Sequence, residues 1–395
     1  IVAPSDKFSI GVIGAGTQSR WLASGFIKLP ETQIVAASEV NSKKMEEFQI
    51  NFNKSVKEFN NQKNQLDTYL NYKELIQRDD IDGVIIATPD HWHAIMTINS
   101  IKSGKHVYCE KPLSHTIDEG RAMVSASRKF KKILQTGSMQ RSSHNFRHAV
   151  NLIRNGYLGK IEKAIVNVGN PSAKCNLPYQ PTPPTIDWDR WIGPAQMRPY
   201  HSTLVDADFF PRWRWYKEFG GGILADWGAH MFDIVQWALD MDNSGPVKLV
   251  PPREPNAVRG LQMTYKNGVE VVHEDFYRGF GVRFIGSKGT LDVSREYLDS
   301  NIKGLVKKSL KNSDTRVYFS DDHLKDWITS IKNNSLPICD VEIGHRSASV
   351  CQLGNIAYEL RETLNWDPVK EEFIDNSRAN FLKTKSFPSL FFTIN

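Results

Sequence analysis

Glu110-Lys111-Pro112 is a short polar element that directly follows the apolar run His106 to Cys109. In a parallel sheet, the residues after a strand lie at the carboxyl edge, where open α/β sheets bind their ligands. Lysine is most often a solvated surface cation, which is the alternative interpretation of Lys111. At a binding edge its ammonium group can instead bind a substrate oxygen and stabilise negative charge that develops there. Pro112 would fix the turn, and it makes a cis peptide bond accessible.

A second polar set follows the glycine run Gly220-Gly221-Gly222. Asp226, His230 and Asp233 are spaced i, i+4 and i+7, so they share one face if the segment is helical. Such a face suits half of a metal site, a solvated charge stripe or an acid/base pair, and the apolar flanks disfavour the stripe. We favour the acid/base pair, in which an aspartate orients His230 and the imidazole takes a proton from a hydroxyl. A metal site remains the alternative, and no metal is predicted.

Gly14 and Gly16 stand between the apolar run Ile10 to Ile13 and a helical stretch. Backbone without a Cβ can approach a pyrophosphate closely, and a helix N-terminus offers unpaired N–H groups and a favourable dipole. The third glycine of the dinucleotide fingerprint is replaced by Ser19. Taken alone, the turn is equally well explained as a plain strand-to-helix connection.

Glu39 favours the dinucleotide over the plain turn. It lies at the end of the next predicted strand, ~20 residues further on, where a carboxylate accepts hydrogen bonds from a ribose diol. The same charge repels a 2′-phosphate, so NAD is the predicted cofactor. Lys43 and Lys44 nearby keep NADP as the less favoured alternative.

The segment Ala87-Thr88-Pro89-Asp90-His91-Trp92-His93 lies where another strand ends and a helix begins. Asp90 would serve as the N-cap of that helix, a role that needs no cofactor. Two histidines separated by one residue suggest a metal, but no carboxylate or cysteine cluster stands close in sequence to complete a ligand set. We prefer capping and cofactor contact to metal binding.

These patterns give a set of predicted site residues. The predicted catalytic residues are Lys111, Asp226 and His230. The predicted cofactor contacts are Gly14, Gly16, Thr17, Gln18, Glu39, Thr88, Pro89, His93, Glu110 and Lys111. The predicted substrate contacts are Lys111, Gln140, Arg212, Trp213, Asp226 and His230.

The elements that must position these residues form two patterns. Up to about residue 140, apolar strand-like runs alternate with amphipathic helical stretches, as in parallel strands joined by right-handed crossovers. The predicted strands are Phe8 to Ile13, Gln33 to Ser38, Asp67 to Leu70, Gly83 to Ala87, His106 to Cys109 and Ile133 to Gly137. The predicted helices are Ser19 to Leu29, Ser42 to Lys54, Tyr72 to Gln77, Trp92 to Ser103 and Ile117 to Lys131.

Beyond residue 140 the pattern changes. A helix from His144 to Asn155 and a strand from Lys160 to Gly169 precede a stretch rich in proline and tryptophan, Pro171 to Tyr216, which we expect to be an ordered loop that walls a site. Turn signals separate the later strands, which indicates an antiparallel sheet. These strands are Ala257 to Tyr265, Val269 to Tyr277, Gly281 to Gly286 and Gly289 to Val293, and helices near Asp321 to Lys332 and Gly344 to Asn365 follow.

A chain of 395 residues is long for a single hydrophobic core, so two domains are expected. The fold class predicted is α/β, with an N-terminal doubly wound parallel sheet of the Rossmann type. A C-terminal α/β domain would carry an open, mainly antiparallel sheet. We place the NAD-binding domain at residues 1–140 and the substrate-binding and oligomerisation domain at residues 141–395.

Composition excludes several classes of protein. Apolar residues make up 40% and charged residues 24%, which are ordinary globular values. The net charge of +6 is scattered, so no nucleic acid partner is expected. No apolar run is long enough to span a membrane. Because the chain opens Ile1-Val2-Ala3-Pro4-Ser5 without a methionine, a leader can have been removed, which leaves a periplasmic and a cytoplasmic location both open.

Taken together, these residues resemble the Gfo/Idh/MocA family, named for glucose-fructose oxidoreductase and inositol dehydrogenase. The resemblance rests on Gly14-x-Gly16, Ala87-Thr88-Pro89, Glu110-Lys111-Pro112 and the glycine-rich helix with Asp226 and His230. It implies a Rossmann domain followed by an α/β domain whose sheet often forms subunit contacts, and hence a homodimer or homotetramer. It also implies that Lys111, Asp226 and His230 are the catalytic lysine, aspartate and histidine.

The chain departs from the family pattern at Ser19 and in its long loop. The tryptophans of that loop either stack on pyranose rings or pack structurally, and both interpretations stay open. They are Trp188, Trp191, Trp213 and Trp215.

The resemblance implies an NAD-dependent enzyme that oxidises or reduces a sugar, a cyclitol or a derivative at an alcohol carbon. The chain also looks like the bacterial branch that includes NAD-dependent α-N-acetylgalactosaminidases, many of which are exported through a twin-arginine leader. Redox-assisted glycoside cleavage without net cofactor turnover is therefore one alternative function. A non-catalytic NAD or sugar sensor is another, disfavoured because Lys111, Asp226 and His230 are all retained.

Overall fold

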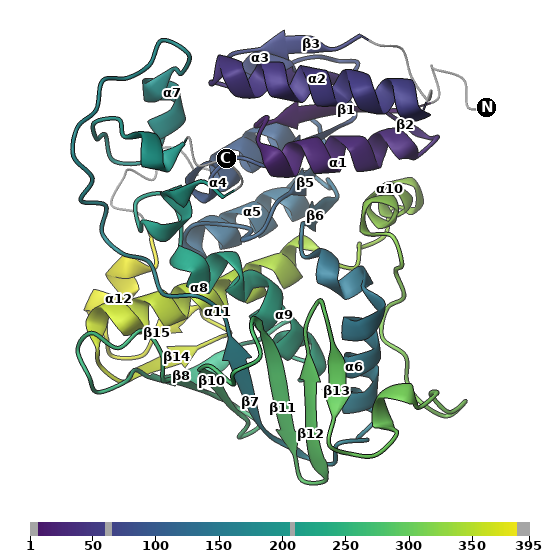
Figure 1. Ribbon diagram of the computed structural model, residues 1–395, viewed down its shortest axis with the longest axis vertical. Coiled ribbons are helices and arrows are strands. Elements are labelled where there is room, and N and C mark those ends of the chain that lie inside the picture. The colour runs from purple at the N-terminus through teal and green to yellow at the C-terminus, as the bar shows by residue number, and fades with distance from the viewer. Residues whose placement is uncertain (1–6, 60–64, 206–209, 385–395) are drawn as a thin grey trace.

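A six-stranded parallel sheet is formed by the first third of the chain in the computed structural model, which describes residues 7–59, 65–205 and 210–384 (Figure 1). Its strand order, β3-β2-β1-β4-β5-β6, confirms the doubly wound arrangement expected from the sequence. The order reverses between β1 and β4, which opens a crevice at the carboxyl edge there. The strands are β1 Phe8–Ile13, β2 Thr32–Ser38, β3 Asp67–Tyr69, β4 Gly83–Ile86, β5 His106–Cys109 and β6 Leu134–Thr136.

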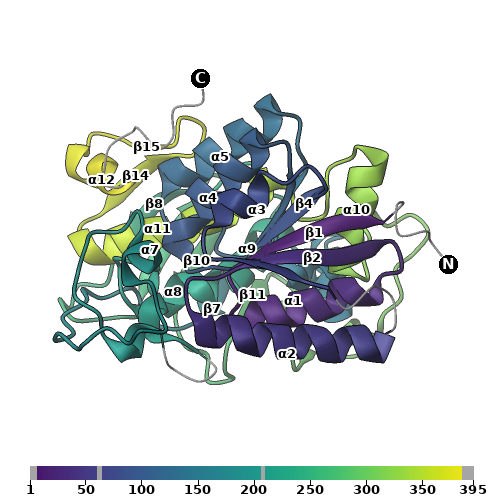
Figure 2. The ribbon, with the colours of Figure 1, turned by 90° about the horizontal axis from the view of Figure 1, so that it is seen from above.

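Helices cover both faces of this sheet, as Figure 2 shows from above. Both faces are covered because the central strands are apolar on both sides: all four residues of β4 are buried. One face packs against α1 (Thr17–Lys28) and α2 (Ser42–Phe59). The other packs against α3 Tyr72–Ile76, α4 Asp90–Lys102 and α5 Ile117–Lys129.

A helix from late in the chain, α10 (His323–Asn333), also packs against the first sheet. Its Trp327 is fully buried, with ring centres 5.7 Å from Phe8, 5.6 Å from Phe26 and 6.0 Å from Tyr108. The core of the Rossmann half therefore includes a helix that we placed in the second domain. The division at residue 140 stays a prediction.

The second sheet has nine strands in the order β13-β12-β11-β7-β10-β9-β8-β14-β15. Its pairs are antiparallel except for β10 and β7, which run parallel. The strands are β7 Ile161–Asn167, β8 Pro246–Val250, β9 Leu261–Tyr265, β10 Glu270–His273, β11 Gly281–Gly286, β12 Gly289–Val293, β13 Leu298–Ser300, β14 Leu364–Asp367 and β15 Glu372–Phe373. One face packs against α6 His144–Arg154, α9 Gly228–Ala238 and α11 Val341–Leu360, and α12 Ser377–Leu382 follows β15.

Two expected helices differ from the structure. The helix predicted to run to Asn365 ends at Leu360, because Arg361 adopts a left-handed conformation with φ of 58° and the chain turns into β14. The segment after the glycine run is broken at Trp227 into α8 (Gly222–Asp226) and α9. Asp226 and Asp233 therefore do not share one continuous helical face, which corrects the expectation from their spacing.

The proline- and tryptophan-rich loop has a small core of its own. The rings of Trp188 and Trp191 stack with centres 4.7 Å apart on α7 (Trp188–Ile192). Trp213 is buried in the same cluster, whereas Trp215 is 40% exposed. Three of the four tryptophans are therefore fixed by structural packing. Within the described residues, no helix is long and apolar enough to cross a membrane.

Candidate functional site

A cavity of about 770 Å³ lies at the carboxyl edge of the first sheet, at the crevice between β1 and β4. Its wall from the first half of the chain includes seven predicted cofactor residues, and the proline- and tryptophan-rich loop contributes Trp191, Trp213 and Arg214. The seven are Gly14, Gly16, Thr17, Gln18, Glu39, Thr88 and Pro89.

The glycine turn fits a bound pyrophosphate. Gly14 has φ of +88°, and a Cβ there would stand 2.8 Å from the carbonyl oxygen of Ala87, so the fold itself requires this glycine. A Cβ at Gly16 would meet nothing within 4 Å, so packing does not require the second glycine. The helix that follows, α1, has no side-chain cap and no acidic residue in its first turn. Its N–H groups are therefore suited to an anionic ligand.

Glu39 is held against this turn at the end of β2. Its Oε2 accepts the N–H of Ala15 at 2.7 Å, and its Oε1 accepts those of Val40 and Asn41 at 2.9 Å each. An ionised carboxylate has about four acceptor positions, so acceptor capacity remains for a ribose diol. The chemistry of this donor and acceptor set fits a dinucleotide.

The long loop is pinned beside this cavity at two places. Next to Glu39, the N–H of Asp187 donates to the carbonyl of Val40 at 2.9 Å. At the start of α4, the indole N–H of Trp92 donates to the carbonyl of Trp191 at 2.9 Å. The loop therefore walls a site, as we expected from its composition.

His93 lies beneath the cavity wall. Its ring nitrogens are 2.9 Å from the carbonyl oxygen of Pro112 and 3.0 Å from that of Thr88, and burial lowers its pKa to about 4. The side chain is 1% exposed and does not line the cavity. In this position His93 supports Thr88 and Pro89 from below. A direct contact between His93 and the cofactor stays a prediction.

Lys111 and Asp226, 115 residues apart in the chain, form a buried ion pair. Lys111 Nζ donates to Asp226 Oδ1 at 2.9 Å and to the Asp226 carbonyl oxygen at 3.0 Å. The side chains are only 15% and 5% exposed. The peptide bond between Lys111 and Pro112 is cis. Two motifs predicted from separate parts of the sequence are thus brought together.

Two residues of the cavity wall are bonded to Asp226 of this ion pair and to Glu110, the neighbour of Lys111. Gln18 Nε2 donates to Glu110 Oε1 at 2.9 Å, and Arg214 Nε donates to Asp226 Oδ1 at 3.2 Å. Burial raises the pKa of Glu110, and the charge of Lys111 opposes that shift. For Asp226 the burial effect is outweighed by Lys111 and Arg214, which hold its pKa below the ordinary value. Through Gln18 and Arg214, the charged residues Glu110, Lys111 and Asp226 therefore adjoin the cavity.

Arg214, rather than the predicted Arg212, reaches the site. Both lie in the Arg212–Trp215 turn, but Arg212 is exposed and its guanidinium lies 4.9 Å over the ring of Trp215. This turn is a 3-10 helix with about three residues per turn, so the two arginines project in different directions. The run Arg-Trp-Arg-Trp alone does not show which of them faces the site. Arg212 as a substrate contact stays a prediction, and Arg214 is the arginine of this turn that lines the cavity and bonds to Asp226.

His230 is 4% exposed, and its Nδ1 has no hydrogen-bond partner among the described residues. Burial, together with the charges of Lys111 and Arg295, places its pKa well below the ordinary 6.5. The imidazole is therefore neutral at pH 7, the form that accepts a proton.

The expected aspartate that orients His230 is not found in the part of the chain that the structure describes. Asp226 is taken up by Lys111 and Arg214, and Asp233 by Arg141 at 2.8 and 2.9 Å. Arg141 and Asp233 are each 1% exposed, so that pair belongs to the core.

Asp90 is a buried carboxyl group close to the ion pair. It lies in the first turn of α4, one residue inside the helix that we expected it to cap, and Pro89 holds the N-cap position. Burial and the nearby charge of Asp226 raise its pKa to about 8, so it is mostly protonated at pH 7. The predicted substrate contact Gln140 is 3% exposed, and neither of its amide atoms has a partner among the described residues.

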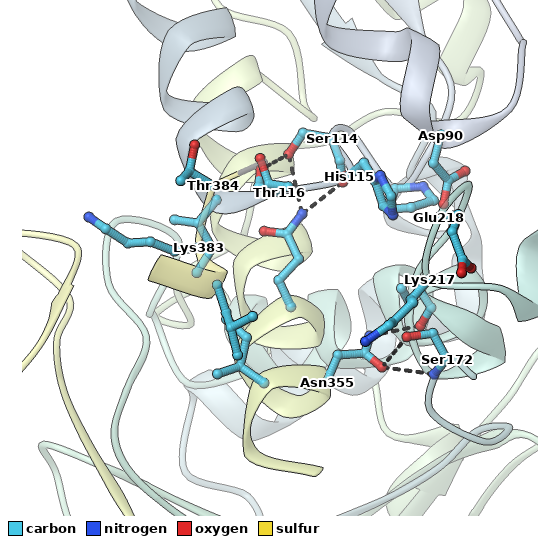
Figure 3. A pocket seen from close by; sticks show the side chains of 18 of the residues that line it. Asp90, Ser114, His115, Thr116, Ser172, Lys217, Glu218, Asn355, Lys383 and Thr384 are labelled. Atoms are coloured by element: carbon cyan, nitrogen blue, oxygen red, sulfur yellow. Dashed lines mark hydrogen bonds between the residues drawn. The ribbon is translucent and has the colours of Figure 1, made fainter. Parts of the chain in front are cut away.

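Asp90 also borders a second cavity, of about 360 Å³ (Figure 3). Asn355 Oδ1 there accepts the N–H of Ser172 at 2.9 Å, and Lys217 lies 3.0 Å from Glu359. None of the predicted catalytic residues lines this cavity. Elsewhere too, the described residues contain no group of three or more His, Cys, Asp or Glu that could hold a metal ion.

Two family models match the chain. Residues 8–138 match the model described as "Oxidoreductase family, NAD-binding Rossmann fold". Residues 164–390 match "Oxidoreductase family, C-terminal alpha/beta domain". Together they cover both sheets.

Similar proteins cover the chain to different extents. An uncharacterized oxidoreductase, YrbE of Bacillus subtilis, is 27% identical over 46% of this chain and 48% of its own length. An alpha-N-acetylgalactosaminidase of Shewanella oneidensis is 36% identical over 23% of this chain and 20% of its own. The chain thus matches half or less of the length of these relatives.

A scyllo-inositol dehydrogenase of Lactobacillus casei, solved with NAD(H) and scyllo-inositol, has a similar structure with a TM-score of 0.61. It is 16% identical, and the alignment covers 91% of this chain and 99% of that one. This likeness establishes the fold alone.

Proposed function

The chain belongs to the Gfo/Idh/MocA oxidoreductase family, and from this premise we propose that it is an NAD-dependent enzyme acting on a sugar, a cyclitol or a sugar derivative. It would transfer hydride between an alcohol carbon and the nicotinamide. The observation that carries the proposal is the Lys111–Asp226 ion pair, which joins the two halves of the chain at the end of the cavity. A neutral His230 stands in the same cluster.

In this proposal each residue of the cluster has one task. The nicotinamide, when bound, supplies the hydride acceptor or donor. His230 takes the hydroxyl proton at a ring nitrogen, which its low pKa leaves free of a proton. Lys111 stabilises the developing alkoxide, Asp226 holds its ammonium group in place, and Glu110 accepts its backbone N–H, so that both acids act as positioning residues. Glu39 holds the ribose, and the turn at Gly14 and Gly16 holds the pyrophosphate.

Redox-assisted glycoside cleavage is a second candidate for the same site. It is favoured by the similarity to an alpha-N-acetylgalactosaminidase. In such a cycle the substrate alcohol is oxidised to a ketone, elimination expels the aglycone, water adds to the double bond that forms, and hydride returns to the ketone, so the cofactor undergoes no net change.

One experiment distinguishes the two functions. The purified protein is incubated with NAD and a panel of sugars, cyclitols and glycosides while NADH absorbance and free sugar are both followed. We expect NADH to form in proportion to substrate oxidised. Sugar release without net NADH would support glycoside cleavage, and tight NAD binding with neither product would favour a sensor.

The organisation of the chain is proposed along with its function. Residues 1–140 would form the NAD-binding unit and residues 141–395 the substrate-binding and oligomerisation unit, in a homodimer or homotetramer. The packing of α10 against the first sheet means that the first unit needs residues 323–333 for a complete core.

A further inference from the structure

Arg295 lies beside the catalytic cluster, in the turn between β12 and β13. Its guanidinium carbon is 4.6 Å over the ring of Trp227, the residue at the break between α8 and α9. The same indole ring meets His230 edge-on, with ring centres 5.9 Å apart. The Arg295 guanidinium and the imidazole of the proposed base therefore contact the same indole ring.

The surface around Arg295 is amphipathic. Phe280, which is 37% exposed, lies beside Trp227 with ring centres 5.1 Å apart. Aromatic faces of this kind suit the apolar face of a pyranose ring. Arg295 itself is exposed, so its N–H groups are open to a ligand at the edge of the site.

Arg295 differs from the other arginines of this part of the sheet in forming no ion pair among the described residues, although the charges of Asp226 and Glu110 act on it. Arg278 is paired with Asp292 and Asp299, and Arg283 with Asp292. A guanidinium presents a rigid fork of donors that matches carboxylate and phosphate groups. At Arg295 this fork is not occupied by the protein's own acids in the described chain.

The cluster next to Arg295 carries an excess of positive charge. Lys111 and Arg214 share a single carboxylate, that of Asp226. Asp90 adds little negative charge at pH 7, because its pKa is raised to about 8. With Arg295 there are three cations against the carboxyl groups of Asp226 and Glu110, so an anionic ligand would balance the site.

We propose that Arg295 binds an anionic group, a carboxylate or a phosphate, on the sugar-like substrate of this site. The inference rests on the proposed function and narrows it to acidic sugars. Because Arg295 and His230 contact the Trp227 ring as two separate groups, the anionic group would lie on a different carbon from the reacting hydroxyl. Uronates and sugar 6-phosphates carry such a group beside their ring hydroxyls.

The test compares matched ligands that differ in the anionic group. Glucose and galactose, their uronates and their 6-phosphates are titrated into the NAD-loaded protein by calorimetry, and kcat/KM is measured for each. We expect one acidic member to bind at least tenfold more tightly than its neutral counterpart. Whether the uronate or the 6-phosphate binds more tightly than the neutral sugar shows which of the two anionic groups Arg295 binds.

Three variants accompany this comparison. Arg295→Gln should remove the preference for the acidic ligand while leaving the affinity for the neutral sugar within about twofold, and Arg295→Lys should restore part of the preference. Arg253→Gln removes one exposed positive charge from the loop between β8 and β9, at the other side of the second sheet, and should change nothing.

The outcomes separate the inference from the function on which it rests. Neutral sugars bound and oxidised as well as acidic ones, a preference that survives Arg295→Gln, or no binding by any acidic member would overturn the inference. Acidic ligands that bind through Arg295 but are never oxidised would instead contradict the proposed function.

Discussion

The carboxylate of Asp226 forms ion pairs with two cations, and these pairs determine which charges act on the neighbouring His230. Lys111 and Arg214 occupy the same Oδ1, at 2.9 and 3.2 Å. No oxygen of Asp226 is hydrogen-bonded to His230 in the described structure, so the imidazole meets only positive charge from Lys111 and Arg295. The site thus keeps its base neutral by burial and by cations, without an orienting acid.

This arrangement predicts the pH dependence of the reaction. The folded pKa of His230 lies well below 6.5, so the base stays deprotonated as the pH falls from 7.5 to 6.5. We expect kcat/KM for the best substrate of the panel to stay level over that range and to fall only at lower pH. A pH-rate profile from 4 to 9 measures it, and an acid limb centred at or above pH 6.5 would contradict the assignment. His230→Gln is the control and should lose the activity across the whole range.

The same shift has a consequence for stability. In the unfolded chain His230 has its ordinary pKa of about 6.5. Below that pH the unfolded chain therefore binds a proton that the folded chain does not bind. The contribution of His230 to stability is therefore present above about pH 6.5 and is lost as the pH falls below it.

Glu39 determines the cofactor preference in this account. Glu39→Gln keeps a carbonyl acceptor for the backbone amides but removes the charge and one acceptor oxygen. We expect NAD to bind about tenfold or more weakly, because a hydrogen bond to a charged group contributes about 1.5–3 kcal/mol. The affinity for NADP should rise relative to that for NAD, since the repulsion of its 2′-phosphate is removed. Calorimetric titration of both cofactors measures this, and an unchanged NAD to NADP ratio would contradict the role of Glu39.

At the scale of elements, the first sheet was predictable because its strands are continuous apolar runs between helical stretches. The ends of β1, β5, β11 and β12 agree with the sequence prediction to the residue. β8, β13, β14 and β15 were missed, since such short strands have no clear period and are defined by pairing with other segments of the sheet.

The site was predictable only where a motif follows an element directly. Lys111 follows β5, and the glycine turn follows β1. The contribution of Arg214 depends on which way a short turn faces, and that of Arg295 on where the turn after β12 lies against α9. The spacing of residues in the sequence predicts neither position, because both arginines are placed by tertiary packing.

The packing of α10 gives a prediction at the same scale. Trp327→Ala removes a fully buried indole that contacts β1, α1 and β5, so we expect a loss of about 3–5 kcal/mol in the free energy of unfolding. Urea titration followed by circular dichroism measures it. Trp215→Ala is the matched control: this indole is 40% exposed, and its removal should cost less than about 1 kcal/mol. Equal effects of the two substitutions would contradict the place assigned to α10.

In the whole molecule, the proposed active site exists only where the two halves meet. The first sheet supplies the cofactor cavity and Lys111, and the second half supplies Asp226, His230 and the loop that walls the cavity. That loop is bonded both to Val40 beside Glu39 and to Trp92 at the start of α4. Cofactor binding and substrate chemistry therefore depend on the same set of contacts between the halves.

The central claim is that Lys111 stabilises charge on the substrate oxygen and is not needed to hold the cofactor. The measurement is NADH formation and NAD affinity in Lys111→Ala, beside Lys217→Ala, which removes an exposed lysine paired with Glu359. We predict that Lys111→Ala lowers kcat by about 10²–10³-fold with the Kd of NAD within about threefold, whereas Lys217→Ala leaves both unchanged. Full activity in Lys111→Ala would contradict the account.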